Sequence, residues 1–192
     1  MVMKGLRGWL TLFDRAFCET FASHYSNRQI MIGCAPSDCG EQILSESQSV
    51  SVILVDDDPD EHFLFQADLE DAGVRFSFAA FTRPEDALAH LRDNGDGPAV
   101  VFTDLSLAGA NALDFIVSVQ PLLGGGAVGV YSGARNPEME AKCRDAGSSF
   151  YIVKPVTREN FSGMIAGLGA VCLEEDRETG ELHLRRAGSA AA

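Results

Sequence analysis

The stretch Ser51-Val-Ile-Leu-Val-Asp-Asp-Asp-Pro59 constrains the fold of this chain more than any other. Its apolar first half is typical of a strand buried on both faces, and Pro59 prevents that strand from continuing. Asp56, Asp57 and Asp58 are therefore expected at the carboxyl end of an interior strand, where open α/β sheets bind ligands. Three adjacent carboxylates repel one another unless a cation neutralises them, and hard divalent ions such as Mg²⁺ prefer carboxylate oxygens.

Helix and strand patterns alternate along the rest of the chain. Further strands are expected at 75–80, 99–103, 127–131 and 149–153, and helices at 59–72, 84–93, 112–120, 137–146 and 157–168. Strict alternation predicts a parallel sheet with right-handed crossovers. Five such units predict a flavodoxin-like, doubly wound α/β fold with strand order 2-1-3-4-5 and helices on both faces.

The first of these helices has a clear start signal. An N-cap residue, a proline at the first helical position and a capping-box acid are predicted at Asp58, Pro59 and Glu61. The capping role makes Asp58 a poor candidate for a metal ligand. The buried face of the helix is predicted to consist of apolar side chains, namely Phe63, Leu64, Ala67 and Leu69.

Residues 1–49 form an extension before the predicted domain at 50–170. Leu6, Leu10, Phe13, Phe17 and Phe21 recur at helical spacing and predict an amphipathic helix over about 6–23, followed by a Ser- and Gly-containing linker. Three interpretations stay open: a docking or dimerisation element, an extension that folds only against its own domain, or a segment upstream of a true start at Met31.

Residues 171–192 form a short tail. Thr179-Gly180 is typical of a turn between two apolar segments, which predicts a small hairpin. This tail is too short to hold a DNA-binding or enzymatic effector domain.

The charge balance argues against nucleic-acid binding. Of a net charge of −13, most falls in residues 51–170, which hold 18 acidic and 8 basic side chains rather than a basic face. Five cysteines without metal-ligand spacing, no signal peptide pattern and no apolar run long enough to span a membrane predict a cytoplasmic protein. The histidines are scattered, and none is expected to transfer phosphate.

Polar side chains follow four of the predicted core strands. Asp56 and Asp57, then Asp104, Ser132 and Lys154, come at successive strand ends and are expected to meet at one edge of the sheet. A carboxylate can attack a phosphoryl group to give an aspartyl phosphate. Phosphoryl transfer has a loose transition state, so the protein mainly has to align the groups and neutralise charge. Mg²⁺ and a lysine ammonium would neutralise the charge on the phosphoryl oxygens, and a hydroxyl would donate a hydrogen bond to one of them.

The chain resembles the receiver domain of two-component response regulators, in the single-domain, chemotaxis-regulator-like form. The resemblance covers about residues 51–170 and is carried by Val52-Ile-Leu-Val-Asp-Asp-Asp-Pro-Asp-Glu61, Val100-Val-Phe-Thr-Asp-Leu105, Val130-Tyr-Ser-Gly133 and Tyr151-Ile-Val-Lys-Pro155. Order and spacing both match the family.

The resemblance implies a role for each matching residue. Asp104 would accept the phosphoryl group, and Mg²⁺ (or Mn²⁺) would be held by Asp56, Asp57, Asp104 and the backbone carbonyl of Ser106. Ser132 and Lys154 would contact the phosphoryl oxygens, and Ser132 and Tyr151 would form the switch. Lys154-Pro155 would be the family's cis peptide.

The resemblance also implies the partners. A sensor histidine kinase or histidine phosphotransfer protein would supply the phosphoryl group, and a downstream protein target would read it. A homodimer would use the face of the fourth helix, fifth strand and fifth helix; neither DNA nor membrane is a partner. The protein would promote only its own phosphorylation and dephosphorylation and would otherwise not be an enzyme. Ala108 and Ala112 replace the usual proline and glycine, which implies a looser loop and a changed phosphoryl lifetime.

Two other functions fit parts of the pattern. Asp56-x-Asp58 also matches haloacid-dehalogenase-type phosphatases, with Asp56 as nucleophile, Asp58 as acid and Asp104 as a structural cap. That function would require a later acidic pair on the fourth strand, where Ser132-Gly133 stands instead. A pseudo-receiver, with the fold but no phosphorylation, is the other alternative.

Overall fold

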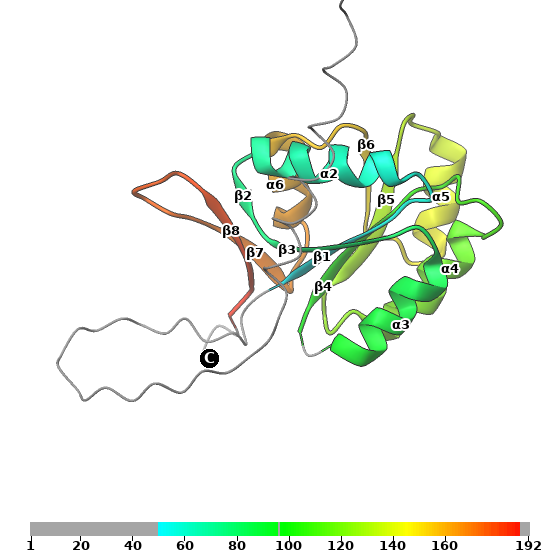
Figure 1. Cartoon of the computed structure of the whole chain (residues 1–192). Coiled ribbons are helices and arrows are strands. Elements are labelled where there is room, and N and C mark those ends of the chain that lie inside the picture. Colours follow the sequence, from blue (N-terminus) through cyan, green and yellow to red (C-terminus); the bar gives the residue numbers. More distant parts are fainter. Residues whose placement is uncertain (1–49, 96, 189–192) are drawn as a thin grey trace, which may run out of the picture. The chain divides into compact units, whose positions relative to one another are not determined.

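The computed structural model describes residues 50–95 and 97–188, and its centre is a parallel sheet (Figure 1). The sheet order is β3-β1-β4-β5-β6, which is the predicted order 2-1-3-4-5 for the five core strands. These strands are β1 (Ser51–Val55), β3 (Ser77–Phe81), β4 (Ala99–Thr103), β5 (Ala127–Ser132) and β6 (Phe150–Val153). The predicted flavodoxin-like topology is therefore confirmed. The amphipathic helix expected over residues 6–23 lies outside the described residues.

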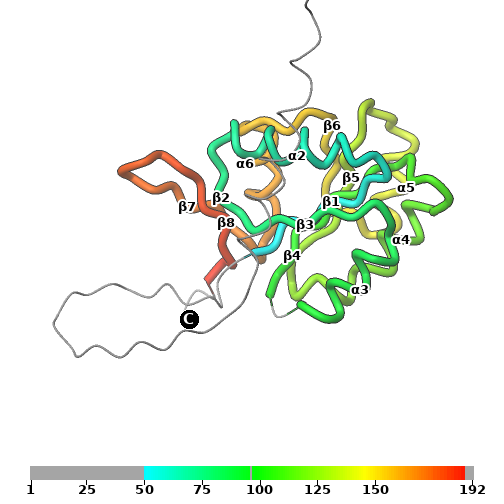
Figure 2. Tube along the Cα trace, in the orientation of Figure 1, coloured from blue at the N-terminus to red at the C-terminus, as the bar shows by residue number. Residues whose placement is uncertain are grey.

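Helices cover both faces of this sheet, as Figures 1 and 2 show. On one face lie α2 (Pro59–Asp71) and α6 (Arg158–Ala166). The other face is covered by α3 (Pro84–Asn94), α4 (Ala112–Val119) with a short 3₁₀ turn after it (Gln120–Leu122), and α5 (Pro137–Asp145). Among the residues with described placement, no helix is both long and apolar enough to cross a membrane.

Strand β1 divides its side chains between two apolar cores. Val52 and Leu54 point into the core under α2 and α6, whereas Ile53 and Val55 point into the core under α3, α4 and α5. Alternation along a strand sends successive side chains to opposite faces, so a strand buried on both faces must be apolar throughout. This explains why the four fully buried residues of β1, at 52–55, are all apolar.

The predicted buried face of α2 is wrong in three of four positions. Phe63 is 73% exposed and Leu64 57% exposed, and Ala67 is exposed as well. Leu69 is buried as predicted, together with Phe65, one turn earlier on the same side of the helix. Residue 63 lies about 160° around the helix from residue 65, so both cannot face the sheet.

A β-hairpin follows α6. Strands β7 (Val171–Glu175) and β8 (Leu182–Arg186) pair antiparallel, and Gly180 in their turn has a φ of 72° that favours glycine. The hairpin prediction is confirmed. Strand β2 (Val74–Arg75) pairs parallel with β8, giving a second sheet of order β2-β8-β7. The strand predicted at 75–80 is thus two strands, β2 and β3, in different sheets.

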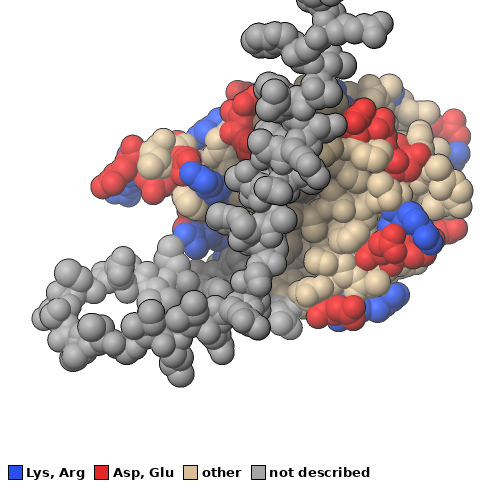
Figure 3. All heavy atoms as spheres, in the orientation of Figure 1, with Lys and Arg blue, Asp and Glu red and all other residues tan. Residues whose placement is uncertain are grey.

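Arg158, on α6, links the hairpin to the rest of the domain through hydrogen bonds. The guanidinium of Arg158 donates to the carbonyls of Ala72 and Gly180, at 3.2 and 3.3 Å, and to the carboxylate of Glu175 at 3.1 Å. Apolar side chains of the hairpin, Val171, Leu182 and Leu184, join the core under α2 and α6. Figure 3 shows acidic and basic side chains gathered on the projecting part of the hairpin.

Candidate functional site

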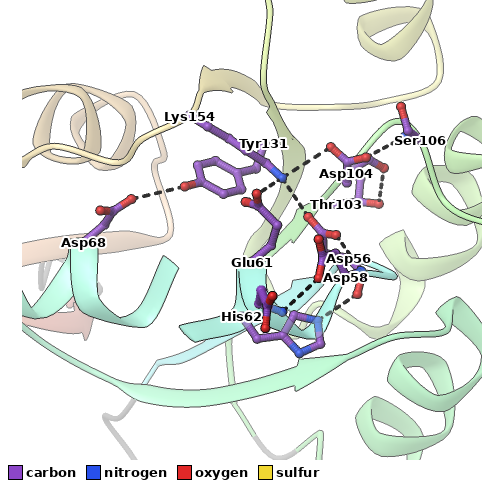
Figure 4. Close-up of polar contacts among 11 residues, drawn as sticks. Asp56, Asp58, Glu61, His62, Asp68, Thr103, Asp104, Ser106, Tyr131 and Lys154 are labelled. Atoms are coloured by element: carbon purple, nitrogen blue, oxygen red, sulfur yellow. Dashed lines mark hydrogen bonds and ion pairs between the residues drawn. The ribbon is translucent and has the colours of Figure 1, made fainter. Parts of the chain in front are cut away.

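The ends of four parallel strands build the site. Backbone hydrogen bonds continue the sheet for one residue beyond the strands, from the amide of Asp56 to Phe81, from Asp104 to Val55 and from Lys154 to Ser132, at 2.9–3.1 Å. These bonds fix where each side chain begins. Figure 4 shows the side chains of Asp56, Asp104 and Lys154 converging at this edge.

Lys154 is at the centre of the cluster. Its Nζ lies 2.8 Å from Asp56 Oδ2, 2.9 Å from Glu61 Oε2 and 3.7 Å from Asp104 Oδ1, and its side chain is only 18% exposed. Burial alone lowers the pKa of the ammonium. The hydrogen bonds to Asp56 and Glu61 and the nearby charge of Asp104 outweigh burial, so that the pKa of Lys154 is raised.

The position of Glu61 corrects the capping prediction. Asp58 caps α2 by accepting a hydrogen bond of 3.0 Å from the amide of Asp60. The carboxylate of Glu61, however, pairs with Lys154 instead of completing a capping box. The backbone amide of Asp58, which a capping box would use, already donates to Asp56 Oδ1 at 3.0 Å, and the Lys154 ammonium offers Glu61 a charged donor instead. Sequence reasoning missed this contact because Glu61 and Lys154 are far apart in the chain.

Asp104 is held by its own loop. Its Oδ2 accepts a hydrogen bond of 2.7 Å from the amide of Ser106, and its backbone carbonyl accepts one of 3.0 Å from the buried hydroxyl of Thr103. The bond from Ser106 fixes Oδ2, and the side chain keeps 13% of its surface exposed to solvent. The carboxylate oxygen nearer to Lys154 is Oδ1.

The three aspartates after β1 have different environments. The carboxylate of Asp56 is almost buried and accepts hydrogen bonds from Lys154 and from the amide of Asp58, at 2.8 and 3.0 Å. Asp57 is exposed. His62 Nε2 lies 2.7 Å from the carbonyl oxygen of Asp56, so this nitrogen is the donor in that contact. His62 is therefore a structural partner of the β1 end rather than a solvated side chain.

The donor set at this edge suits a hard divalent cation. Within the described ranges, no group of three or more Asp, Glu, His or Cys side chains is arranged closely enough to hold a metal ion. The available donors are nevertheless all oxygens: the carboxylates of Asp56, Asp57 and Asp104 and the backbone carbonyl of Ser106. Oxygen donors of this kind fit Mg²⁺ or Mn²⁺ rather than softer metals.

The remaining predicted residues lie on neighbouring strand ends. Ser132 ends β5 and is half-buried. Tyr151, on β6, is half-buried and donates a hydrogen bond of 2.8 Å to the carbonyl of Ala134, in the loop after Ser132. The Lys154–Pro155 peptide bond is cis. Among the departures from the family pattern, Ala108 is exposed and Ala112 is buried at the start of α4.

A buried tyrosine next to Lys154 was not predicted as part of the site. The Nζ of Lys154 lies 5.1 Å from the ring centroid of Tyr131, within the range of a cation–π interaction. Burial, and then the charge of Asp68, raise the pKa of the Tyr131 phenol. The one signal of this contact in the sequence is that an aromatic residue stands directly before Ser132.

Solved structures of the same fold include several response regulators. The chemotaxis response regulator CheY4 of Vibrio cholerae is 19% identical (TM-score 0.51), over 62% of this chain and 98% of that one. The bacteriophytochrome response regulator AtBRR is 24% identical (TM-score 0.53), over 62% and 91%. A response regulator of Burkholderia pseudomallei, solved with a phosphorylated aspartic acid, calcium and citrate, is 19% identical (TM-score 0.50), over 62% and 66%.

Identities at this level establish the fold alone, and no curated protein matches the chain. The family assignment rests on a family model, described as the response regulator receiver domain, which matches residues 52–166. These residues contain β1 except its first residue, β2 to β6, all four strand ends of the site and the whole of α6. The chain belongs to the response regulator receiver domain family.

Proposed function

We propose that residues 50–170 act as a phosphoacceptor receiver in which Asp104 takes a phosphoryl group from a histidine kinase or a histidine phosphotransfer protein. The observation that carries this proposal is the setting of the Asp104 carboxylate. One oxygen is fixed by the Ser106 amide at 2.7 Å, and the other faces the Lys154 ammonium at 3.7 Å. A nucleophile and a positive charge are thus already oriented at an accessible edge.

The reaction is a single phosphoryl transfer. A bond forms between a carboxylate oxygen of Asp104 and phosphorus, while the bond from phosphorus to the donor imidazole nitrogen breaks and that nitrogen is protonated. Such transfers have loose transition states, so alignment and neutralisation of oxygen charge contribute most of the catalysis. Lys154 would neutralise charge on the phosphoryl oxygens, and the Ser132 hydroxyl would donate to one of them.

A divalent cation would complete the charge balance. Asp56, Asp57, Asp104 and the Ser106 carbonyl are the residues that we assign to hold it. When bound, Mg²⁺ supplies positive charge to the phosphoryl oxygens as a Lewis acid. The phosphorylated aspartic acid and calcium in the Burkholderia pseudomallei regulator support this assignment.

We further propose that phosphorylation changes a protein-binding face. Ser132 would move toward the phosphoryl group, and Tyr151 would leave the carbonyl of Ala134 and turn inward. The surface of α5, β6 and α6 would then bind a downstream protein or a second copy. Residues 1–49 would be an extension and residues 171–192 a tail of this regulator.

The phosphatase alternative is less compatible with the geometry. Both oxygens of Asp56 accept hydrogen bonds, from Lys154 and from the Asp58 amide, and the side chain is 3% exposed. Asp58, the acid in that alternative, accepts a hydrogen bond from the amide of Asp60 at the start of α2. A substrate ester would have to displace these contacts first. No contact in the described residues disfavours the pseudo-receiver alternative in the same way, so the experiment below decides between it and the receiver.

The test is intact-mass measurement after treatment with acetyl phosphate and Mg²⁺. We expect one phosphoryl adduct on the wild type, dependent on Mg²⁺, and none on Asp104→Asn. Folded wild-type protein that takes no adduct would favour the pseudo-receiver. An adduct that survives Asp104→Asn but is lost in Asp56→Asn would favour the phosphatase.

A further inference from the structure

We propose that Glu61 is a positioning residue that holds Lys154 away from Asp104 and thereby slows phosphorylation. This inference rests on the proposed function and adds to it a residue outside the assigned site. Its starting point is a comparison of distances: Lys154 Nζ lies 2.9 Å from Glu61 and 3.7 Å from Asp104. The ammonium is thus nearer to Glu61 than to the phosphoacceptor (Figure 4).

The present contacts of Lys154 limit how closely its ammonium approaches Asp104. An ammonium has three N–H donors. In this structure it contacts Asp56 at 2.8 Å and Glu61 at 2.9 Å, both closer than Asp104. The third donor remains free, but these two contacts hold Nζ 3.7 Å from Asp104 Oδ1, beyond hydrogen-bond distance. A closer approach of the ammonium to a phosphoryl group on Asp104 therefore lengthens one of the two contacts. Asp56 is almost buried, whereas the Glu61 side chain is 29% exposed and can turn toward solvent at lower cost.

The negative charge of Glu61 also opposes phosphorylation. An incoming phosphodonor is an anion, and a phosphoryl group carries about two negative charges near neutral pH. At an edge that already holds the carboxylates of Asp56, Asp57 and Asp104, Glu61 adds a further negative charge and increases repulsion. Both effects act in the same direction, because Glu61 retains the ammonium and repels the donor.

Tyr131 supports the Lys154 ammonium when Glu61 releases it. The ring of Tyr131 lies beneath the ammonium, 5.1 Å from Nζ to centroid. A cation–π contact tolerates lateral shifts of the cation better than a hydrogen bond does. Lys154 can therefore move toward Asp104 without losing this contact, and Glu61 is the contact that changes.

The experiment compares Glu61→Gln with Glu138→Gln. Glu138 makes an exposed ion pair of 2.8 Å with Lys142 on α5, so its variant removes the same charge and the same type of contact away from the site. Phosphorylation by acetyl phosphate at saturating Mg²⁺ is followed by intact mass. We expect the rate to rise about three- to tenfold for Glu61→Gln relative to Glu138→Gln. Glu61→Asp keeps the charge but shortens the side chain by one methylene and weakens the contact with Lys154, so its rate is expected to fall between those of the wild type and Glu61→Gln.

A second readout needs neither phosphate nor metal. The chain has three lysines, Lys4, Lys142 and Lys154, so ¹³C-lysine labelling gives few NMR signals. Because Lys154 lies over an aromatic ring, its ε-methylene shift reports its position. We expect Glu61→Gln to move the Lys154 signal and Glu138→Gln to move only that of Lys142.

The outcomes separate this inference from the proposed function. A wild type that is phosphorylated on Asp104, with Glu61→Gln no faster than Glu138→Gln, would overturn the role of Glu61 and leave the receiver function intact. An unchanged Lys154 signal in Glu61→Gln would overturn it as well. A wild type that takes no phosphoryl group would contradict both proposals together.

Discussion

The phenol of Tyr131 donates a hydrogen bond of 3.3 Å to the carboxylate of Asp68 on α2. The same carboxylate oxygen accepts a hydrogen bond of 3.2 Å from the amide of Val156, two residues after Lys154. Asp68 therefore joins the end of β5 to the loop that carries the site lysine. A side chain outside the candidate site thus contacts two of the strand ends that form it.

This relationship predicts how stability depends on pH. Because burial favours the neutral phenol and raises the pKa of Tyr131, its contribution is present below the unfolded pKa of about 10 and is lost as the pH rises above it. We expect the free energy of unfolding of Tyr131→Phe, measured with urea between about pH 9 and pH 11, to fall less steeply than that of the wild type. Equal slopes would contradict this account. Tyr151→Phe, which also removes one phenol hydroxyl, is the control, and its slope is expected to stay close to that of the wild type.

A second prediction concerns the charge of Lys154. In Lys154→Met the carboxylates of Asp56, Glu61 and Asp104 lose their shared cation. We expect the free energy of unfolding to fall by about 1–3 kcal/mol without Mg²⁺, and added Mg²⁺ to stabilise the variant more than the wild type. Urea unfolding with and without Mg²⁺ measures both effects.

The matched control is Lys142→Met. Lys142 pairs with Glu138 on an exposed helix surface, so its loss is expected to cost less than about 1 kcal/mol. Similar costs in the two variants, with the same response to Mg²⁺, would show that the strand-end carboxylates do not depend on Lys154.

A third prediction compares two phenylalanines of α2. Phe65 is fully buried, and its ring centroid lies 4.9 Å from those of Phe102 and Tyr131, whereas Phe63 is 73% exposed. We expect Phe65→Ala to lower the free energy of unfolding by about 3–5 kcal/mol, and Phe63→Ala to change it by less than about 0.5 kcal/mol. Chemical denaturation of both variants checks this. A large loss of unfolding free energy in Phe63→Ala would instead indicate that Phe63 belongs to the buried face of α2.

A fourth prediction concerns the hairpin. Arg158→Ala removes the hydrogen bonds to Ala72, Glu175 and Gly180 while leaving the apolar contacts of β7 and β8 in place. We expect faster amide hydrogen exchange in β8, with exchange in β1 and β4 unchanged, because local opening depends on local contacts. Hydrogen exchange followed by mass spectrometry resolves these segments. Unchanged exchange in β8 would mean that apolar packing alone holds the hairpin.

Local pattern was sufficient to predict the sheet and the polar residues at its edge. Buried parallel strands must be apolar, so the residues at which the pattern breaks, such as Asp56 and Asp104, were visible as strand ends. The capping of α2 by Asp58 also followed from short-range chemistry. In each of these cases, the residues that determine the local structure lie within a few positions of it in the sequence.

The errors have the opposite origin. Glu61 was assigned to its own helix because its partner, Lys154, comes from a strand far along the chain. Phe65 was missed because α2 has apolar residues at 63, 64 and 65, and only the packed sheet decides which of them is buried. The split between β2 and β3 depends on β8, whose pairing with β2 is a long-range contact.

The most direct test of the central claim is the position of the phosphoryl group on the chain. Borohydride reduces an aspartyl phosphate to homoserine, which peptide mass spectrometry locates to one residue. After treatment of the full chain with acetyl phosphate and Mg²⁺, the account predicts homoserine at position 104 and unmodified Asp56, Asp57 and Asp58. Homoserine at position 56, or at none of these positions in protein shown to be folded, would contradict it.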